Sequence, residues 1–371
     1  MHKKIFFLLI FLLTVNLCLA QKAGNNVYQF MNYRFSARLA GLGGSLIAVR
    51  DNDPSLIMYN PSTIAPRFNS SLLVGAADYF AHTGYGSVMY SQTFNKVGSF
   101  AMEMRYAGYG VFTRTDEIGN ELGTFSCNDV GLTLGWGRAL DSCFSLGANL
   151  KLMYSGYESY SSFGLAVDVA ASYYNEKKDI ALALLVKNIG GELKPFVDGK
   201  YNWAPFDIQI AFSQRFKFLP VRYHISLHHL YKWEMGYVGS NDPLLEVDAM
   251  SGKPKYPTKF KQGINNFFRH INFGLEIIPV KYLSLFVSYN HDQNRAMYIP
   301  QKRSMAGFAY GFSIDIHSIQ FGFSRSHYAV GATPNCFHFS VNINELSQLS
   351  KTKKQKKLER VTTSLGYLAN P

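Results

Sequence analysis

The sequence predicts an all-β protein: a transmembrane outer-membrane β-barrel of about 14 antiparallel strands, with an N-terminal plug segment. Three observations lead to this prediction: alternating side-chain polarity, an export signal, and connections that alternate between short and long. In residues 144–155, apolar side chains such as Leu150 and Leu152 alternate one by one with polar or small ones such as Lys151. A period of two places the two kinds of side chain on opposite faces of a strand.

Residues 1–20 have the features of a secretory signal peptide. Lys3 and Lys4 precede an apolar run over residues 5–13, and Ala20 is a suitable residue before the cleavage site. This run is too short to span a bilayer, and no later run approaches the ~20 apolar residues that a membrane helix needs. We therefore expect an exported protein.

The composition agrees with a membrane barrel. Charged residues make up 17% of the chain and aromatic residues 15%, whereas soluble proteins have about 25% charged residues. Much of the net charge of +12 comes from the signal peptide and from the segment after Ser350. The charge is therefore weak support for nucleic-acid binding, and we expect no nucleic-acid partner.

Residues 21–69 lack strand-like alternation and are predicted to form the plug segment inside the barrel mouth. Small residues are frequent here, among them Gly41, Gly43 and Gly44. Asp53 precedes Pro54, which is the order of an N-cap followed by proline in the first helical turn. We expect a short helix that ends at Asn60-Pro61. The alternative is a periplasmic leader outside the barrel.

Residues 70–345 are predicted to form the barrel. Fourteen segments have lengths near the 9–11 residues with which a tilted strand crosses a bilayer. They are residues 70–80, 84–94, 97–107, 125–137, 143–155, 162–174, 179–188, 205–216, 221–231, 267–278, 282–292, 305–316, 318–327 and 336–345. Every second connection is a tight turn and most of the others are longer. This order is typical of a barrel with short periplasmic turns and long extracellular loops.

An even strand number predicts that both chain termini are periplasmic; twelve or sixteen strands are the alternative counts. The strands of a soluble β-sandwich would also alternate in polarity, but short and long connections need not alternate along its chain. The basic tail, residues 346–371, is expected in the periplasm as a solvated end, and contact with an acidic partner is the functional alternative.

The apolar faces are expected to contact lipid and the polar faces to line the lumen. Predicted outward residues include Phe206, Ile208, Ile210, Phe308, Tyr310, Phe337 and Phe339. Predicted inward residues include Asp207, Gln209, Arg222, His224, His228, His338 and Ser340. An Arg or Lys that faces hydrocarbon would cost roughly 2–4 kcal/mol at mid-depth, and this cost sets the register.

The sequence predicts no enzymatic activity, no metal site and no cofactor. His224 and His228 share the lumen face while His229 points away, so we expect solvated histidines rather than metal ligands. No G-x-S-x-G, Walker or HExxH motif occurs. Ser226 or Ser340 with His338 could form a lumen pair, but Ser and His are ordinary lumen residues.

The N-terminal motifs resemble those of the PorQ family, whose members are outer-membrane components of the type IX secretion system. This family is similar to PorV and to the FadL-like barrels, which have fourteen strands and an N-terminal plug. The motifs are Gly24-Asn25-Asn26-Val27-Tyr28-Gln29-Phe30, Ser36-Ala37-Arg38, Gly41-Leu42-Gly43-Gly44-Ser45, Asp53-Pro54-Ser55 and Asn60-Pro61-Ser62. The resemblance implies that Arg38, Gly41, Gly43, Gly44, Asp53, Asn60 and Pro61 are plug motif residues.

The resemblance also implies a role without catalysis in an attachment complex. Such a barrel would contact outer-membrane lipid and anchor a surface protein similar to PorZ, together with proteins similar to PorU and PorV. Cargo in that complex loses its C-terminal signal and is joined to lipopolysaccharide. The predicted loop over residues 232–266 suits a protein contact, although a lid packed on itself is the alternative. Its candidate partner-binding residues are Trp233, Tyr237, Leu244, Leu245 and Tyr256.

The main alternative function is a FadL-like transporter of hydrophobic small molecules. It requires an apolar pocket in the lumen and a passage past the plug. The predicted inward residues are mostly polar, which disfavours a fatty-acid tunnel. Inward Phe286 and Met153 would be compatible with a small one.

Overall fold

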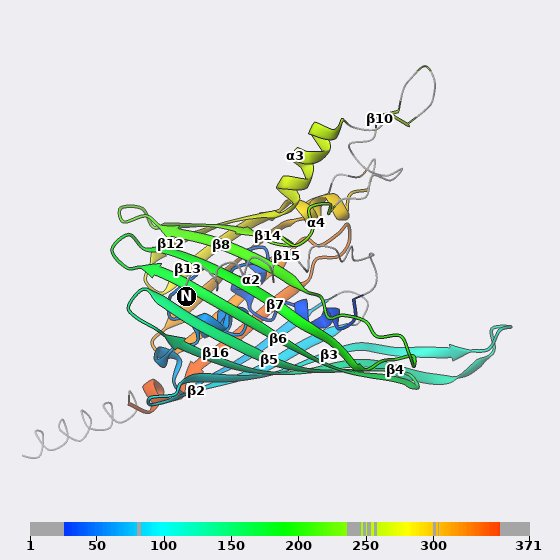
Figure 1. The fold of residues 1–371 in the computed structure, drawn as a ribbon, viewed down its shortest axis with the longest axis horizontal. Helices are drawn as coiled ribbons and strands as arrows, with labels where there is room; N and C mark the ends of the chain where they lie inside the picture. Colours follow the sequence, from blue (N-terminus) through cyan, green and yellow to red (C-terminus); the bar gives the residue numbers. More distant parts are fainter. Residues whose placement is uncertain are drawn as a thin grey trace, which may run out of the picture.

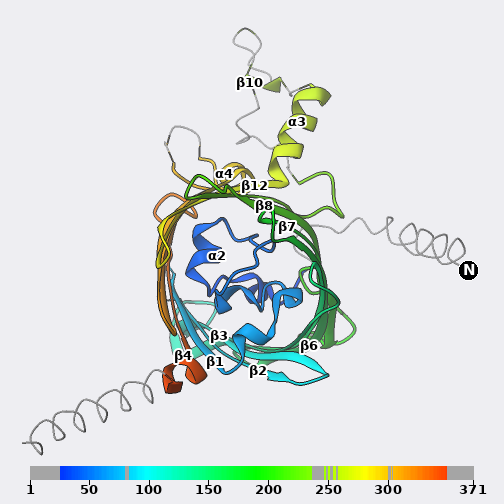
Figure 2. The ribbon, with the colours of Figure 1, turned by 90° about the vertical axis from the view of Figure 1, so that its left-hand side faces the viewer.

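A computed structural model describes residues 26–79, 83–235, 246–247, 250, 254–255, 258–299, 302 and 304–348. The predicted signal peptide and nearly all of the basic tail lie outside these residues. Fourteen strands close into one antiparallel barrel, and two short strands form a separate pair (Figures 1 and 2). The prediction of a 14-stranded antiparallel barrel with an N-terminal plug is confirmed.

Neighbouring strands of the barrel follow one another in the sequence, and the barrel closes where β1 pairs with β16 from Ser71↔Asn342 to Asp78↔Asn335. The barrel strands are β1 (Ser71–Asp78), β2 (Gly84–Phe94), β3 (Gly98–Thr115), β4 (Glu121–Ala139), β5 (Phe144–Tyr157), β6 (Tyr160–Asn175), β7 (Ile180–Lys194), β8 (Asp207–Arg215), β9 (Val221–Leu227), β12 (Ile271–Val280), β13 (Leu283–Asn290), β14 (Phe308–Ile316), β15 (Ile319–Ser326) and β16 (Asn335–Asn342). The separate pair is β10 (Glu246–Val247) and β11 (Pro254–Lys255).

Side chains alternate between the lumen and the outer surface along these strands. In β16, Phe337 and Phe339 are 41% and 47% exposed, whereas His338 between them is 1% exposed. Asp207 and Arg222 are likewise buried on the inner face of β8 and β9. The outer surface therefore carries the apolar band of a membrane-spanning barrel, and the predicted assignment of faces is confirmed.

The plug passes through the lumen from the long-loop end to the short-turn end and appears as the blue segment inside the ring in Figure 2. At the long-loop end, the Val27 N–H donates to the Trp203 carbonyl at 3.1 Å. At the short-turn end, the Ser70 N–H donates to the Ser91 carbonyl at 2.9 Å. Its short helices are η1 (Gln29–Asn32), α2 (Ala37–Gly41), η2 (Pro54–Leu56), η3 (Pro61–Thr63) and η4 (Pro66–Phe68).

The first described residues therefore lie at the long-loop end, opposite the start of β1. Both actual chain termini fall outside the described residues. The predicted periplasmic location of both termini stays a prediction.

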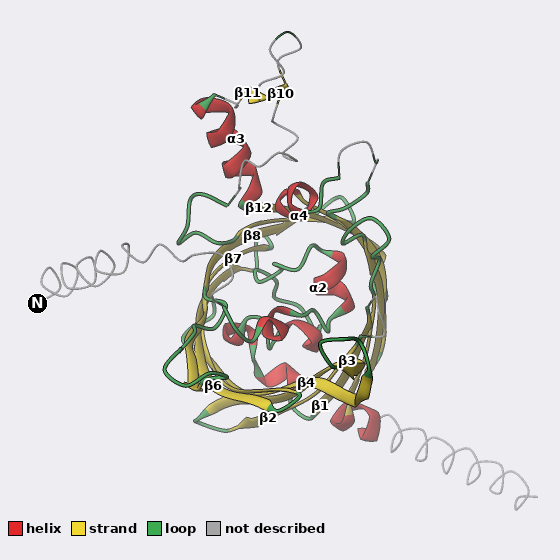
Figure 3. Ribbon diagram, turned by 90° about the vertical axis from the view of Figure 1, so that its right-hand side faces the viewer, coloured by secondary structure: helices red, strands yellow, loops and turns green. Residues whose placement is uncertain are grey.

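Two helices replace parts of the predicted loops and strands. Helix α3 (Lys259–Arg269) lies where the sequence predicts a loop and the start of a strand. Helix α4 (His291–Ala296) replaces the end of the strand predicted at residues 282–292, because the Asn290 side chain accepts from the Gln293 N–H and starts a helix there. Both helices lie at the long-loop end, and α3 projects outward from the barrel wall (Figures 2 and 3).

Candidate functional site

A buried ion-pair network centred on Arg38 joins the plug to the barrel wall. The Ser36 side chain caps α2, and Arg38 reaches from this helix to β12. Arg38 Nε and Nη2 donate to the two carboxylate oxygens of Glu276 at 2.8 and 2.9 Å. Arg38 Nη1 lies 2.7 Å from Asp51 and 3.2 Å from Asp53. Arg38 and Glu276 are 4% and 0% exposed, so these charges depend on one another rather than on water.

Arg222 of β9 is the second cation of this network. Its Nη1 lies 3.0 Å from Asp51 and 3.2 Å from Glu276. Burial by itself would raise the pKa of the Asp51 carboxyl, but the neighbouring Arg38 and Arg222 hold that pKa below its usual value. The network thus combines two arginines with three carboxylates from the plug and the wall.

The lumen histidines are not solvated, and that expectation is wrong. His224 and His228 are each 4% exposed. His224 Nε2 lies 3.7 Å from Glu276, and His228 Nδ1 lies 2.6 Å from His229 Nδ1. These side chains are buried because the plug occupies the lumen that they face.

Three further motif residues shape the plug chain itself. Asp53 caps η2 by accepting from a backbone N–H at 2.8 Å. Asn60 caps η3 at 3.1 Å and also donates to the Ile47 carbonyl at 2.6 Å. Pro61 begins η3 and lies against Gly147 of β5. The predicted helix after Asp53 is shorter than expected, because η2 covers three residues only.

The motif glycines lie at close contacts of the plug, either with the barrel wall or within the plug itself. A Cβ on Gly43 would lie 2.2 Å from Asn272 Oδ1, and the φ of Gly43 is 82°, in the left-handed region. A Cβ on Gly41 would lie 2.2 Å from the Phe286 ring. Gly44 lies against Arg34 within the plug. The sequence analysis identified these glycines as motif residues, but it did not predict which residues they contact.

Arg105 of β3 forms a second link between the wall and the plug, which the sequence analysis missed. Its Nη1 donates to the Met31 carbonyl at 2.9 Å, and its Nη2 lies 2.7 Å from Glu103. The guanidinium lies 5.4 Å from the Phe35 ring centre and 5.0 Å from that of Tyr59. Cation–π attraction of this kind is strongest in desolvated sites. The signal that could have identified this link is the position of Arg105, which faces inward between outward Met104 and Tyr106.

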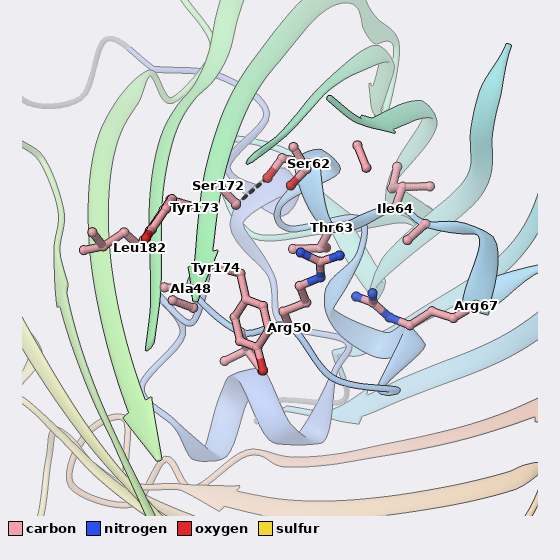
Figure 4. Close-up of a pocket in the computed structure, with 15 residues that line it drawn as sticks. Ala48, Arg50, Ser62, Thr63, Ile64, Arg67, Ser172, Tyr173, Tyr174 and Leu182 are labelled. Atoms are coloured by element: carbon pink, nitrogen blue, oxygen red, sulfur yellow. Dashed lines mark hydrogen bonds between the residues drawn. The ribbon is translucent and has the colours of Figure 1, made fainter. Parts of the chain in front are cut away.

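Small cavities lie between the plug and the wall in the described part of the chain. One of about 40 Å³ lies beside Arg105, and one of about 30 Å³ lies beside Arg50 and Arg67 at the short-turn end (Figure 4). Each has room for a few water molecules. Phe286 and Met153 are 3% and 0% exposed because they pack against plug residues. A larger molecule would have to displace plug side chains at these places.

The hairpin of β3 and β4 extends beyond the barrel at the long-loop end (Figure 1). β2 pairs with β3 as far as Gly108, and β5 pairs with β4 as far as Cys127. Beyond these points β3 and β4 pair with each other as far as Thr115↔Glu121, and no other described strand pairs with them. Exposed apolar residues on this extension include Val111, Ile118 and Leu122, at 72%, 85% and 61%.

Of the five candidate partner-binding residues, only Trp233 lies in the described part of the chain. Its ring stacks on His270 at 5.6 Å, and it remains 59% exposed. Tyr237, Leu244, Leu245 and Tyr256 lie outside the described residues. The prediction that these five residues bind a partner therefore stays a prediction.

Helix α3 exposes an apolar face that the sequence analysis missed. Its polar side contacts α4: Asn265 Oδ1 lies 3.2 Å from His291 Nε2, and Arg269 lies 3.3 Å from Asp292. The exposed apolar residues are Phe260, Ile264, Phe267 and Phe268. Their spacing of four, three and one residues is helical, and this period was the signal that could have identified the helix.

Within the described residues, no group of three or more His, Cys, Asp and Glu side chains is placed to hold a metal ion. Cys127, Cys143 and Cys336 are free thiols. The described helices include none that is long and apolar enough to cross a membrane.

The closed barrel and its apolar outer band establish the class of protein. The chain is a 14-stranded outer-membrane β-barrel. No protein-family model and no curated protein matches it. Among solved structures it is similar to the Pseudomonas putida toluene transporter TodX, with a TM-score of 0.46 and 11% identity over 81% of this chain and 95% of that chain.

Two further similar structures each cover 83% of this chain. A Pseudomonas aeruginosa FadL homologue has a TM-score of 0.45 and 12% identity, over 83% of this chain and 98% of that chain. CymD, named as a monoaromatic hydrocarbon channel, has a TM-score of 0.46 and 10% identity, over 83% of this chain and 96% of that chain.

Proposed function

We propose that this protein is a non-enzymatic membrane anchor of a type IX secretion attachment complex, and that it holds a PorZ-like surface protein at its long-loop end. The observation that carries the proposal is the contrast between the interior of the barrel and its long-loop end. The lumen is occupied by a plug held by buried ion pairs, while apolar surface without a described partner extends beyond the barrel. The motif resemblance supplies the named complex, including the PorU-like and PorV-like partners.

The filled lumen supports a role at the surface rather than in the pore. Moving the plug would separate Arg38 from Glu276, and an uncompensated buried charge is strongly destabilising, by about 3–5 kcal/mol. Arg105 and its aromatic neighbours on the plug, Phe35 and Tyr59, add a second set of contacts that would also break. A plug held in this way suits a static scaffold.

The extended β3–β4 hairpin supplies the partner surface in this proposal. Its outer edges carry unpaired backbone groups, which can pair with a strand of another protein. Its apolar side chains, with Ile118 at 85% exposure, are suited to the centre of a protein contact. We propose a β-rich surface protein as the occupant.

Purification of the tagged full-length protein from native outer membranes in mild detergent, followed by mass spectrometry, tests the proposal. We expect a large surface β-protein and a sortase-like protein to co-purify. The double variant Ile118→Asp/Leu122→Asp should lose them. The matched control is Phe218→Asp, which changes a 97% exposed apolar residue in the β8–β9 turn at the other end of the barrel and should retain them. Recovery of the unaltered barrel alone would contradict the proposal.

A transporter of hydrophobic small molecules is the second candidate. The observation that favours it is the pair of cavities along the plug, which could mark a path that opens when the plug moves. The functional names of the similar solved structures agree with this candidate, although the likeness concerns the fold only. Uptake of a fluorescent fatty acid into proteoliposomes that increases in an Arg38→Met variant would support transport. No uptake by either protein would exclude it.

A further inference from the structure

The cavity at the short-turn end contains two arginines and no carboxylate. Arg50 and Arg67 both line it, and its other described lining residues are apolar, aromatic or hydroxyl-bearing. Figure 4 shows both guanidinium groups turned into the same space beside Thr63. The cavity is partly open to solvent at the end of the barrel that carries the short turns.

Neither arginine has an ionic partner within the described residues. Arg50 Nη1 donates to the Ser142 carbonyl at 3.2 Å, and the Arg50 guanidinium lies 5.2 Å from the centre of the Tyr174 ring. The Arg67 guanidinium lies 4.6 Å from the Phe68 ring centre, and Arg67 Nε is buried without a hydrogen-bond partner. A guanidinium has five N–H donors, and no described protein group accepts a hydrogen bond from the buried Nε of Arg67.

The carboxylate that acts electrostatically on Arg67 belongs to Asp51, and it is already engaged. Asp51 lies 2.7 Å from Arg38 and 3.0 Å from Arg222. Burial lowers the pKa of Arg67; Asp51 opposes this effect, and the like charge of Arg50 adds to it. Two guanidinium groups with the same charge thus share a partly dry space.

The aromatic contacts do not by themselves explain this arrangement. A cation–π contact contributes about 0.5–2 kcal/mol, whereas a buried charge without a partner costs more. An anion between the two groups would compensate both charges and take up the unused donors. Two planar guanidinium groups offer the paired N–H donors that bind phosphate oxygens at two points.

We propose that Arg50 and Arg67 form a binding site for a phosphate group, with the hydroxyl of Ser145 as an additional donor. The cavity is partly open, so a phosphate can reach the two guanidinium groups while the rest of a larger ligand stays outside. Free inorganic phosphate and the phosphate headgroup of an anionic lipid share this chemistry. This proposal does not depend on the proposed secretion role.

Calorimetric titration of inorganic phosphate into the full-length protein in non-ionic detergent tests the site, with chloride at matched ionic strength as the reference. We expect saturable binding to the unaltered protein. Arg67→Gln and Arg50→Gln should each weaken it roughly tenfold or more, because each removes charge-assisted hydrogen bonds. The matched control is Arg114→Gln, which removes an arginine from the exposed hairpin, where it pairs with Glu158, and should leave binding unchanged.

A second arm distinguishes the source of the phosphate. Native mass spectrometry after incubation with phosphatidylglycerol or phosphatidylcholine vesicles should show retained phosphatidylglycerol if a lipid headgroup occupies the site, and the Arg67→Gln variant should lose it. If that variant fails to fold, Arg67→Lys keeps the charge without the two-point geometry and should still weaken binding. Equal binding by all variants, or no saturable binding of phosphate or lipid, would overturn the proposal.

Discussion

Arg38 and Glu276 lie 238 positions apart in the sequence and meet inside the barrel as a two-point ion pair with distances of 2.8 and 2.9 Å. The pair connects α2 of the plug to the middle of β12. Glu276 also contacts Arg222, and Arg38 also contacts Asp51 and Asp53. The position of the plug therefore depends on a balance between two cations and three anions.

This balance predicts unequal effects of removing each partner. Arg38→Met leaves three carboxylates with Arg222 alone, so we expect a loss of about 3–5 kcal/mol in the free energy of unfolding. Glu276→Gln leaves two arginines with Asp51 and Asp53, so we expect a smaller loss of about 1.5–3 kcal/mol. Urea unfolding in lipid vesicles, followed by tryptophan fluorescence, measures both. Equal losses would contradict the described network.

The contacts of Arg105 predict that lysine cannot replace it. Lysine can keep one contact with Glu103, but it loses the stacking on Phe35 and Tyr59 and the fork that reaches the Met31 carbonyl. We expect Arg105→Lys to lower the free energy of unfolding by about 1–3 kcal/mol.

The matched control for Arg105→Lys is Arg114→Lys on the exposed hairpin, where a surface ion pair contributes about 0–1 kcal/mol. Two measurements compare the variants: urea unfolding in lipid vesicles, followed by tryptophan fluorescence, and tryptic cleavage after Arg34 in the plug. A plug in Arg105→Lys that resists trypsin as well as the control would show that Arg105 does not hold it.

The barrel was predictable because its signal is local. The inward position of Glu276 follows from its place between outward Leu275 and Ile277, and the same period holds along most strands. The partner of Glu276 was not predictable, since no local pattern links β12 to a plug arginine. The sequence analysis also predicted that this strand, β7, ends at residue 188.

The structure continues β7 to Lys194 through a bulge. Two residues, Lys187 and Asn188, oppose Asp168 alone, and the Asn188 N–H donates to the Asp168 side chain at 2.7 Å. The φ of Asn188 is 57°. A bulge of this kind depends on the neighbouring strand, so the predicted end at residue 188 was wrong.

The tip of the β3–β4 hairpin predicts an acid-sensitive turn. Asp116 accepts from the Asn120 side chain at 2.8 Å and from the backbone N–H groups of Asn120 and Ile118 at 2.7 and 3.0 Å. These bonds hold the pKa of the Asp116 carboxyl below its usual value. The stabilisation is therefore fully present above the pKa of an unfolded Asp, and it is lost as pH falls through the lowered pKa.

The backbone amide of Asn120 reports this titration. We expect its NMR chemical shift to change with a midpoint below that of Asp in an unfolded hairpin peptide. In Asp116→Asn the same amide should show no such titration, because the carboxyl is absent. A midpoint equal to that of the peptide would contradict the turn geometry.

The close approach of Gly43 to Asn272 predicts that two glycine substitutions with similar backbone conformations will differ. Gly43 has a φ of 82° and Gly119 a φ of 89°, so alanine is strained at both positions, by about 1–3 kcal/mol. A Cβ at Gly43 would also lie 2.2 Å from Asn272 Oδ1, whereas nothing lies within 4 Å of one at Gly119. Gly43→Ala should therefore lower the free energy of unfolding more than Gly119→Ala, and it should make the plug more sensitive to trypsin. Equal effects would mean that Gly43 is required only for its backbone conformation and not for the contact between plug and wall.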